Sequence, residues 1–345
     1  MRKYRAGIIG LGRMGSTIDD EFPGAPFLPY SVAAACRAHP KIELVAGADI
    51  DPERRRAFAE RWGVKAVYED FQEMLAKEDL DLVAVTTRGD THASIAAVAA
   101  RAVPMLYCEK AIACSMAEAD ALLQACRESG TKFNSGTLKR FHPRYRQARE
   151  LVLSGAVGEP LAAVYWARRS PLMHMHIHSI DAIMFMLGDP KIRRVRGTLR
   201  GDVRFAGHRL DQDPDALYQI EFENGVLAQV VPAGALDYEI AGTQGAVRVE
   251  NNGAAVRLRR QDENSPVRWP VWTERPVPFV DAGSGTLAAL NDLIEAYEQD
   301  RPTANPIELA HRATEACLAV AESHRLGGVW MDLPLANRDL YVWHV

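Results

Sequence analysis

The chain has 345 residues, 48% of them hydrophobic, and its 41 basic and 45 acidic residues give a net charge of −4. This length predicts about two domains with sizeable cores. A nearly balanced charge without basic blocks argues against nucleic acid as a partner. No apolar run approaches the length that spans a bilayer, so no membrane partner is expected. With no signal-peptide pattern and five scattered cysteines without a C-x-x-C pair, we expect a soluble, cytoplasmic protein with reduced thiols.

The first residues predict a nucleotide-binding turn. The apolar residues 6–9 read as a buried strand, and this strand runs directly into a G-x-G-x-x-G pattern. The glycines allow a tight turn, the close approach of the backbone to a pyrophosphate and close packing of the next helix. An ordinary glycine-rich turn is the alternative. The residues expected to contact the dinucleotide here are Gly10, Gly12, Arg13, Met14 and Gly15.

A proline-rich insert follows this turn. Residues 19–30 contain three prolines and cannot be helical throughout, and helical spacing resumes only at residues 32–37. The insert has two interpretations. It is either a surface loop that tolerated insertion or a lid that reaches over the cofactor or substrate.

The second strand, residues 42–49, ends in an acidic residue. We expect the Asp49 carboxylate to accept hydrogen bonds from the adenosine ribose hydroxyls. Because a carboxylate repels a 2′-phosphate, the sequence favours NAD over NADP. The alternative is that Asp49 caps a helix or forms a turn before Asp51-Pro52.

Strands and helices then alternate up to about residue 134. Helices are expected at residues 52–62, 71–77, 91–102 and 116–129, and strands at 66–68, 82–86, 105–108 and 132–134. This alternation predicts a doubly wound parallel sheet, in which ligands bind at the carboxyl ends of the strands. The cofactor contacts expected at these ends and in the following helix are Thr87, His92, Glu109 and Lys110.

Beyond residue 140 the pattern changes. A helix at 143–153 is followed by strands at 161–167, 193–199, 216–222, 226–231, 238–240, 246–250 and 255–259, and helices return at 287–297 and 309–324. Asn224-Gly225 is a strong hairpin signal. We therefore expect a Rossmann domain at 1–138 and an α+β domain at 139–345. The apolar residues 340–345 are expected to dock on their own domain or on a neighbouring subunit.

With these features in hand, the chain resembles the glucose–fructose oxidoreductase/inositol dehydrogenase (Gfo/Idh/MocA) family over most of its length. Single motifs of this family are weak signals, but their order and spacing are specific. The matching landmarks are Gly10-Leu11-Gly12-Arg13-Met14-Gly15, Asp49-x-Asp51-Pro52-Glu53, Cys108-Glu109-Lys110, Arg140-Phe141-His142-Pro143-x-Tyr145, Ser154-Gly155-x-x-Gly158-Glu159-Pro160, His178-x-x-Asp181 running to Leu187-Gly188, Glu223-Asn224-Gly225 and Glu239-Ile240-x-Gly242-Thr243-x-Gly245.

The resemblance implies a second domain built on a large, open, mostly antiparallel sheet. It also implies a bound nicotinamide cofactor, a sugar or cyclitol substrate, and a homodimer or homotetramer formed through that sheet. The expected activity is an NAD(P)-dependent dehydrogenase acting on a secondary alcohol. Two alternatives occur in the family: a redox-neutral, NAD-dependent glycoside-cleaving enzyme, and a non-catalytic regulator that senses nucleotide.

The resemblance also assigns catalytic roles. Lys110 would bind and polarise the reacting hydroxyl, and His178 would be the general base, because histidine titrates near neutrality. In a helix, His174 and Asp181 share a face with His178, so Asp181 could orient its ring. The further substrate-binding candidates are His174, Arg140 and Trp166.

Two positions depart from the family pattern. Ala111 stands where proline is usual, and His174 stands where many members carry aspartate, so a neutral imidazole replaces a negative charge. The alternating His174, His176 and His178 would face one way on a strand and could then chelate a metal ion, whereas on a helix His176 points elsewhere. Since family members generally need no metal, none is expected.

Overall fold

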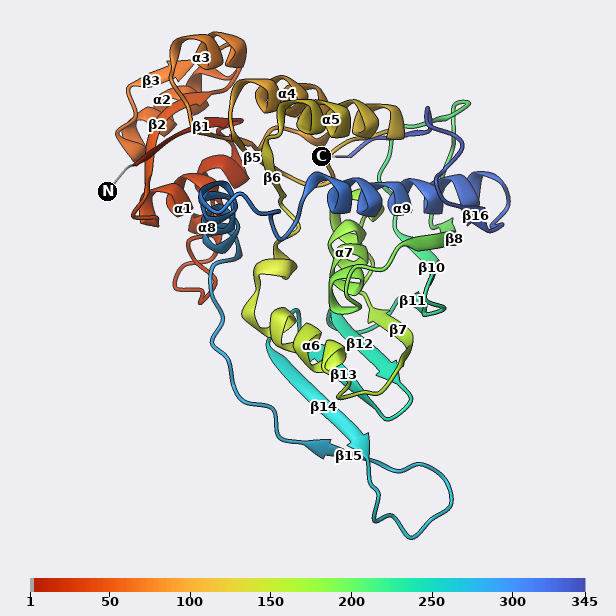
Figure 1. Ribbon diagram of the computed structural model, residues 1–345. Helices are drawn as coiled ribbons and strands as arrows, with labels where there is room; N and C mark the ends of the chain where they lie inside the picture. The colour runs from red at the N-terminus through yellow and green to blue at the C-terminus, as the bar shows by residue number, and fades with distance from the viewer. Residues whose placement is uncertain (1–2, 345) are drawn as a thin grey trace. The chain divides into compact units, whose positions relative to one another are not determined.

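The structure is a computed structural model that describes residues 3–344. The chain divides into two units (Figure 1). The first contains residues 3–141 and 283–314 together with Trp343 and His344, and the second contains residues 142–282 and 315–342. The predicted domains, 1–138 and 139–345, are continuous stretches, and these boundaries stay a prediction. The first unit also includes a segment from the second half of the chain.

The first unit contains a six-stranded sheet of order β3-β2-β1-β4-β5-β6 in which every pair is parallel. This confirms the predicted doubly wound sheet. The strands are Tyr4–Ile9 (β1), Ile42–Ala48 (β2), Ala66–Tyr68 (β3), Leu82–Val85 (β4), Met105–Cys108 (β5) and Lys132–Ser135 (β6). The α-helices that connect them are Val32–Ala38 (α1), Pro52–Trp62 (α2), Phe71–Lys77 (α3), Gly89–Ala102 (α4) and Met116–Ser129 (α5).

Local sequence signals explain where these helices begin and end. The Ser115 side chain caps α5 by accepting the N–H of Glu118, and α5 ends at Gly130, whose φ is +69°. A left-handed residue after a helix is the usual position of glycine. By contrast, no regular helix follows the glycine turn of β1. A π-helical turn, Arg13–Thr17, and a 3₁₀ turn, Ile18–Glu21, lead into the predicted insert.

The insert is held within the first unit. The Asp19 carboxylate accepts the N–H groups of Tyr30 and Ser31 at 2.8 and 2.9 Å. Thr286, at the start of helix Gly285–Glu298 (α8), donates its hydroxyl to the Tyr30 carbonyl oxygen at 2.7 Å. These contacts hold the two ends of the insert in place. Whether the insert acts as a surface loop or as a lid stays a prediction.

Helix α8 belongs to the first unit because its apolar face is part of the core of that unit. Leu290 and Leu293 are fully buried in the same hydrophobic cluster as Ile8 of β1 and Tyr107 of β5. Each side chain buried in this way contributes roughly 1.5–3 kcal/mol to folding. Helix Ile307–Arg325 (α9) then passes from the first unit into the second.

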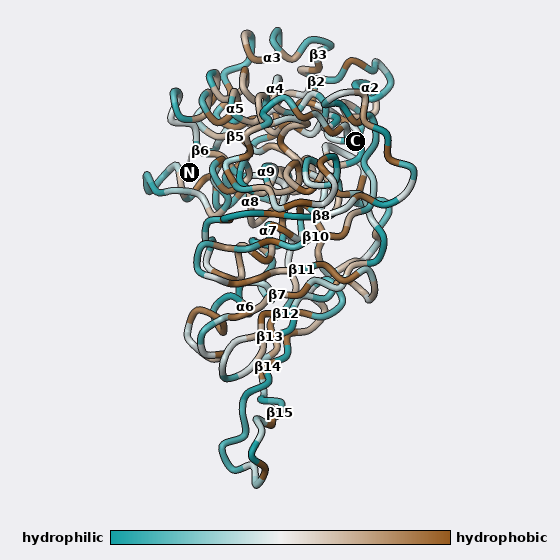
Figure 2. The backbone as a smooth tube through the Cα atoms, turned by 90° about the vertical axis from the view of Figure 1, so that its right-hand side faces the viewer, coloured by the Kyte–Doolittle hydropathy of each residue, from teal (hydrophilic) through white to brown (hydrophobic). Residues whose placement is uncertain are grey.

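The second unit is built on a nine-stranded, mostly antiparallel sheet of order β15-β14-β13-β12-β7-β11-β10-β8-β16, in which only the β7–β11 pair is parallel. Burial alternates along β10, so one face of the strand is covered. Figure 2 shows the hydropathy of each residue along the backbone of this sheet. The predicted hairpin at Asn224-Gly225 is confirmed by the antiparallel pairing of β10 and β11. The strands are Pro160–Trp166 (β7), Ile192–Leu199 (β8), Ala216–Phe222 (β10), Leu227–Val231 (β11), Asp237–Gly242 (β12), Gly245–Glu250 (β13), Ala255–Gln261 (β14), Trp272–Arg275 (β15) and Met331–Asp332 (β16).

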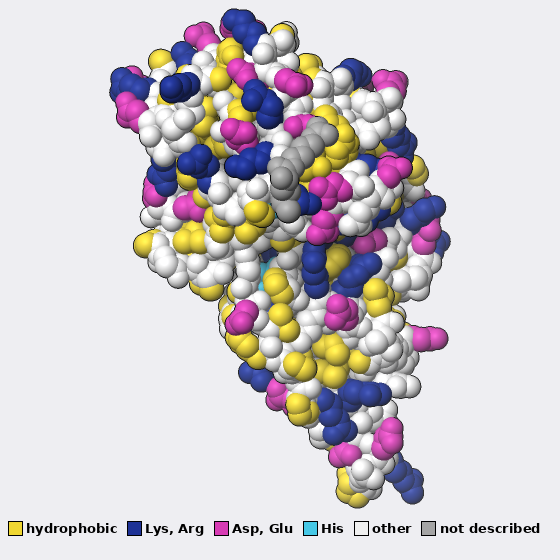
Figure 3. All heavy atoms as spheres, turned by 60° about the vertical axis from the view of Figure 1, so that its left-hand side comes forward, with side chains coloured by type: hydrophobic (Ala, Val, Ile, Leu, Met, Phe, Trp, Pro, Cys, Tyr) yellow, Lys and Arg dark blue, Asp and Glu magenta, His cyan; other side chains and the backbone are white. Residues whose placement is uncertain are grey.

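Helices Pro143–Leu153 (α6) and Ile177–Met186 (α7), the end of α9 and a small sheet complete this unit. Helix α6 matches its prediction, and α7 continues directly from a π-helical turn, Leu172–His176. Strands Arg209–Leu210 (β9) and Tyr341–Val342 (β17) pair in parallel. Within residues 3–344, no helix is both long and apolar enough to cross a membrane. Basic and acidic side chains are intermixed on the face drawn in Figure 3.

Candidate functional site

The carboxyl ends of neighbouring parallel strands bring the predicted cofactor residues of the first unit to one edge of the sheet. Ile9, at the end of β1, is in register with Ala48 of β2 and with Val85 of β4. Val85 is in turn paired with Cys108 of β5. The order of the strands reverses between β1 and β4, which is where doubly wound sheets bind their ligands. The segments that start at this edge are the glycine turn, Asp49, Thr86-Thr87 and Glu109-Lys110.

The glycine turn leaves room for a ligand at its centre. Gly10 has a φ of +92°, and a Cβ there would lie 2.7 Å from the Thr86 carbonyl oxygen. A Cβ on Gly15 would lie 2.8 Å from the Thr86 hydroxyl oxygen. Gly12 differs, because a Cβ there would meet no atom closer than Nη1 of Arg54, at 3.5 Å. The protein itself therefore requires glycine at two of the three positions, while the open space at Gly12 fits a pyrophosphate lying against the backbone.

Asp49 ties this turn to the end of β2. Its side chain is only 5% exposed. Oδ2 accepts the N–H of Leu11 at 2.8 Å, and Oδ1 accepts the N–H of Asp51 at 2.9 Å. The N-cap of α2 is Asp51, whose side chain accepts the N–H of Glu53. Asp49 is thus a turn residue rather than the helix cap, and its contact with a ribose stays a prediction.

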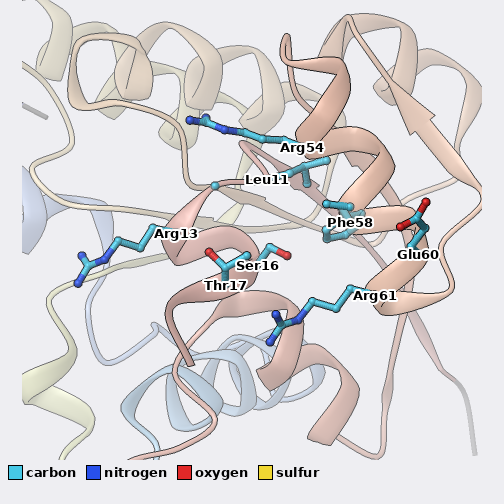
Figure 4. Close-up of a pocket in the computed structure, with 10 residues that line it drawn as sticks. Leu11, Arg13, Ser16, Thr17, Arg54, Phe58, Glu60 and Arg61 are labelled. Atoms are coloured by element: carbon cyan, nitrogen blue, oxygen red, sulfur yellow. The ribbon is translucent and has the colours of Figure 1, made fainter. Parts of the chain in front are cut away.

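A cavity of about 660 Å³ lies beside the glycine turn, and three arginines line it (Figure 4). Arg13 is paired with Glu21, with 2.5 Å between Nε and Oε1, and Arg61 is paired with Asp20, with 2.6 Å between Nη1 and Oδ2. Arg54 forms longer ion pairs, because its nitrogens lie 3.6 Å from Asp51 and 3.8 Å from Asp49. Apolar surface beside a cation suits a planar base next to a phosphate. The other side chains labelled in Figure 4 are Leu11, Ser16, Thr17, Phe58 and Glu60.

His92 joins the loop after β4 to the loop after β5. Its Nδ1 lies 2.8 Å from the carbonyl oxygen of Ala111, and its Nε2 lies 3.1 Å from that of Thr87. Burial lowers the pKa of His92, although these two carbonyls oppose the shift. The ring lies between the two loops, and in its neutral form its single N–H donates to one of these two carbonyl oxygens. The peptide bond between Lys110 and Ala111 is cis.

Glu109 and Lys110 have different environments. Glu109 is 5% exposed, and its carboxylate accepts the Tyr107 hydroxyl at 2.7 Å and the Lys110 N–H at 3.3 Å. A Cβ on Gly136 would lie 2.6 Å from its Oε2. Burial, and then the negative charge of Glu109, raise the pKa of Tyr30 to about 12. The Glu109 carboxylate is thus held inside the protein, whereas the Lys110 side chain is only half-buried.

In the second unit, His174, His178 and Asp181 lie on one continuous helical segment, residues 172–186. Spacings of four and three residues place side chains on the same helix face. The Asp213 carboxylate supports the start of this segment by accepting the N–H of His174 at 2.8 Å. Asp181 is fully buried, whereas His174 and His178 are half-buried.

His176 faces a different set of partners. Its Nδ1 lies 3.2 Å from the Tyr218 hydroxyl, and its Nε2 lies 3.4 Å from Oδ1 of Asp215. Because the segment is helical, the strand arrangement in which three alternating histidines face one way does not form. Across residues 3–344, no three His, Cys, Asp or Glu side chains are grouped so that they could hold a metal ion.

The remaining two candidates lie in different units. Arg140 belongs to the first unit, in the 3₁₀ turn Leu138–Phe141, and is 1% exposed. Trp166 ends β7 in the second unit, where the Arg248 guanidinium lies 4.4 Å from its ring centroid. Their contact with a substrate stays a prediction.

The structure therefore forms two groups of predicted site residues, one in each unit. Sequence reasoning missed the hydroxyl of Thr86, which lies 2.6 Å from the Gly10 carbonyl oxygen, and it missed the buried His344. The position of Thr86 at the end of a strand was a usable signal. The apolar segment 340–345 predicts that this end of the chain docks, but the sequence does not indicate that His344 packs against Gly89, 255 residues earlier.

Comparison with known proteins identifies the family. Residues 4–137 match the Gfo/Idh/MocA family of oxidoreductases with an NAD-binding Rossmann fold, and residues 169–333 match the C-terminal α/β domain of that family. The chain is 29% identical over 343 residues to inositol 2-dehydrogenase from Acidothermus cellulolyticus, covering 94% of this chain and 93% of that protein. It is 26% identical over 241 residues to 2,7-anhydro-N-acetylneuraminate hydratase from Mediterraneibacter gnavus, covering 62% and 63%.

A solved structure shares the same fold. It is the WlbA dehydrogenase from Bordetella pertussis in complex with NADH and UDP-GlcNAcA, with a TM-score of 0.75, 18% identity, and coverage of 97% of this chain and 100% of that chain. Since both domain models match, and together span most of the residues, the chain belongs to the Gfo/Idh/MocA family of NAD-binding oxidoreductases.

Proposed function

We propose that this protein is a dehydrogenase that uses NAD to oxidise a secondary alcohol of a sugar, a cyclitol or a related compound. The observation that carries the proposal is the open backbone cradle at Gly12 on the same sheet edge as the half-buried amine of Lys110. A pyrophosphate site and a cationic hydrogen-bond donor are what such a reaction needs. The relative named inositol 2-dehydrogenase supports a polyhydroxylated substrate.

When bound, NAD supplies the acceptor for the hydride that leaves the carbinol carbon. The Lys110 ammonium group donates a hydrogen bond to the reacting hydroxyl and stabilises the negative charge that develops on its oxygen. A ring nitrogen of His178 takes the hydroxyl proton, and Asp181, one helical turn later, orients that ring. His174, on the same face, binds the substrate through its imidazole ring where many relatives present a carboxylate.

We further propose that NAD is preferred over NADP. The Asp49 carboxylate accepts the N–H groups of Leu11 and Asp51, and its negative charge would repel the 2′-phosphate of an adenosine ribose bound beside it. Arg54 opposes this preference, because its Nη1 is 3.8 Å from Oδ2 of Asp49 and its side chain is 57% exposed. Direct titration with both dinucleotides measures the balance.

The decisive experiment follows NADH formation by the purified protein with NAD and a panel of sugars, cyclitols and sugar acids. Lys110→Ala should lower kcat/KM by at least about 100-fold, because it removes the group that stabilises the developing charge. Lys65→Ala is the matched control, since this exposed lysine lies just before β3. Equal turnover by the Lys110→Ala variant and the wild-type protein would refute the assignment of Lys110.

A redox-neutral reaction is the second candidate, favoured by the relative named a hydratase. In that reaction the hydride returns to the product, so no NADH accumulates although substrate is consumed. Product analysis by mass spectrometry, with NAD present in trace amounts, separates it from net oxidation. A protein that binds NAD, consumes nothing from the panel and is unaffected by Lys110→Ala would instead fit a nucleotide-sensing regulator.

We also propose that two or four copies assemble through the nine-stranded sheet. Light scattering on the purified protein measures the number of copies. A monomer at all concentrations tested would refute this assembly.

A further inference from the structure

The last described residues pack inside the first unit. Trp343 and His344 belong to that unit, although β17, directly before them, pairs with β9 of the second unit. Figure 1 shows this end of the chain near α4, whose first residue, Gly89, it contacts. The His344 side chain is fully buried. The sequence predicts that the apolar residues 340–345 dock on their own domain or on a neighbouring subunit. In the structure β17 does pair within the second unit, but Trp343 and His344 belong to the first unit.

The ring of His344 fills the space that a side chain at residue 89 would need. A Cβ on Gly89 would lie 2.6 Å from His344 Nε2 and closer still to two other atoms of the ring. Gly89 is the first residue of α4, and its φ lies outside the left-handed region. The backbone conformation therefore does not require glycine at this position, but the packing of His344 does.

The contact between His344 and Gly89 is linked to the predicted cofactor loops through His92. The ring centroid of His344 is 6.1 Å from that of His92. His92 in turn contacts the carbonyl oxygens of Thr87 and Ala111, in the loops after β4 and β5. The neighbouring Trp343 also contacts the start of α4, because the guanidinium of Arg88, the residue before this helix, lies 5.5 Å from the Trp343 ring centroid.

We propose that His344 is a positioning residue for the cofactor. Its ring holds the start of α4 and the ring of His92, and through His92 it sets the loops that carry Thr87 and Lys110. This inference rests on the proposed function for the identity of the ligand, NAD. The segment after β17 then affects the affinity for the cofactor, although it lies far from the glycine turn in the sequence.

The test uses the full chain and measures the Kd for NAD by fluorescence titration, together with the thermal midpoint of unfolding. Gly89→Ala should force the His344 ring out and weaken NAD binding by about tenfold, and His344→Ala should do the same. The double variant should bind NAD no more weakly than His344→Ala alone, because the new methyl group enters the space that the ring has left. Gly283→Ala is the matched control, since a Cβ there meets no atom within 4 Å.

His344→Phe should restore NAD affinity to within about twofold of the wild-type value, because a ring again packs against Gly89. In turnover assays, the KM for NAD should rise in Gly89→Ala and His344→Ala while kcat at saturating NAD is retained. A role limited to stability would instead lower the thermal midpoint and the active fraction, and would leave the Kd for NAD unchanged.

Two results overturn the inference while the proposed function stands. In the first, the wild-type protein binds NAD and both single variants bind it with the same affinity. In the second, the double variant loses NAD affinity by the product of the two single losses. A wild-type protein that does not bind NAD at all refutes the proposed function first, and with it the ligand assigned here.

Discussion

The hydroxyl of Thr86 offers a direct test of how the glycine turn is held. Its Oγ1 lies 2.6 Å from the carbonyl oxygen of Gly10 and 3.2 Å from that of Ile9, and the residue is 7% exposed. Thr86→Val keeps the branched shape of the side chain but replaces the donor with a methyl group. Leaving a buried carbonyl without its donor costs about 1–3 kcal/mol. We place the cost near the middle of this range, because the Ile9 carbonyl oxygen keeps the Thr86 N–H as a donor at 2.8 Å.

A loss of about 2 kcal/mol should lower the thermal midpoint by roughly 4–8 °C for a unit of this size, as calorimetry would measure. Thr273→Val is the matched control. The Thr273 hydroxyl is buried and finds no hydrogen-bond partner among residues 3–344, so its removal should cost no stability. The reasoning fails if Thr86→Val is as stable as the wild-type protein, or if both substitutions cost the same.

Two further predictions concern the cofactor and pH. Arg54→Ala should weaken NADP binding more than NAD binding and change the ratio of their Kd values by about tenfold. Arg56→Ala, on the same helix, is the control and should leave that ratio unchanged. Titration measures both Kd values, and an unchanged ratio in Arg54→Ala would contradict the prediction. Burial lowers the pKa of His92 below its unfolded value of about 6.5, so the unfolded chain binds more protons. The contribution of His92 to the free energy of unfolding is therefore complete above pH 6.5. It is lost as the pH falls below that value, by up to about 1.4 kcal/mol per pH unit. Chemical denaturation should show a shallower loss of stability in His92→Gln.

The local patterns predicted most of the elements because their causes are local. The 3.6-residue period of apolar residues placed α5 at its observed bounds, Met116–Ser129, and the structure shows that Ser115 and Gly130 cap it there. The strand at residues 105–108 followed from a short, wholly apolar run that is buried on both faces. The short strands β9, β15, β16 and β17 escaped prediction, because, unlike the equally short strands of the first unit, they do not belong to a regular alternation of strands and helices.

The sequence alone determined the parallel sheet, the glycine turn and the family, since these depend on spacing within short segments. Only the tertiary structure decided that α8 packs in the core of the first unit and that Asp49 accepts the N–H of Leu11. It likewise decided that His344 lies against Gly89, 255 residues earlier in the chain. Contacts of this kind join residues that share no period or motif, because burial and hydrogen bonding depend on which surfaces meet in space and not on the distance along the chain.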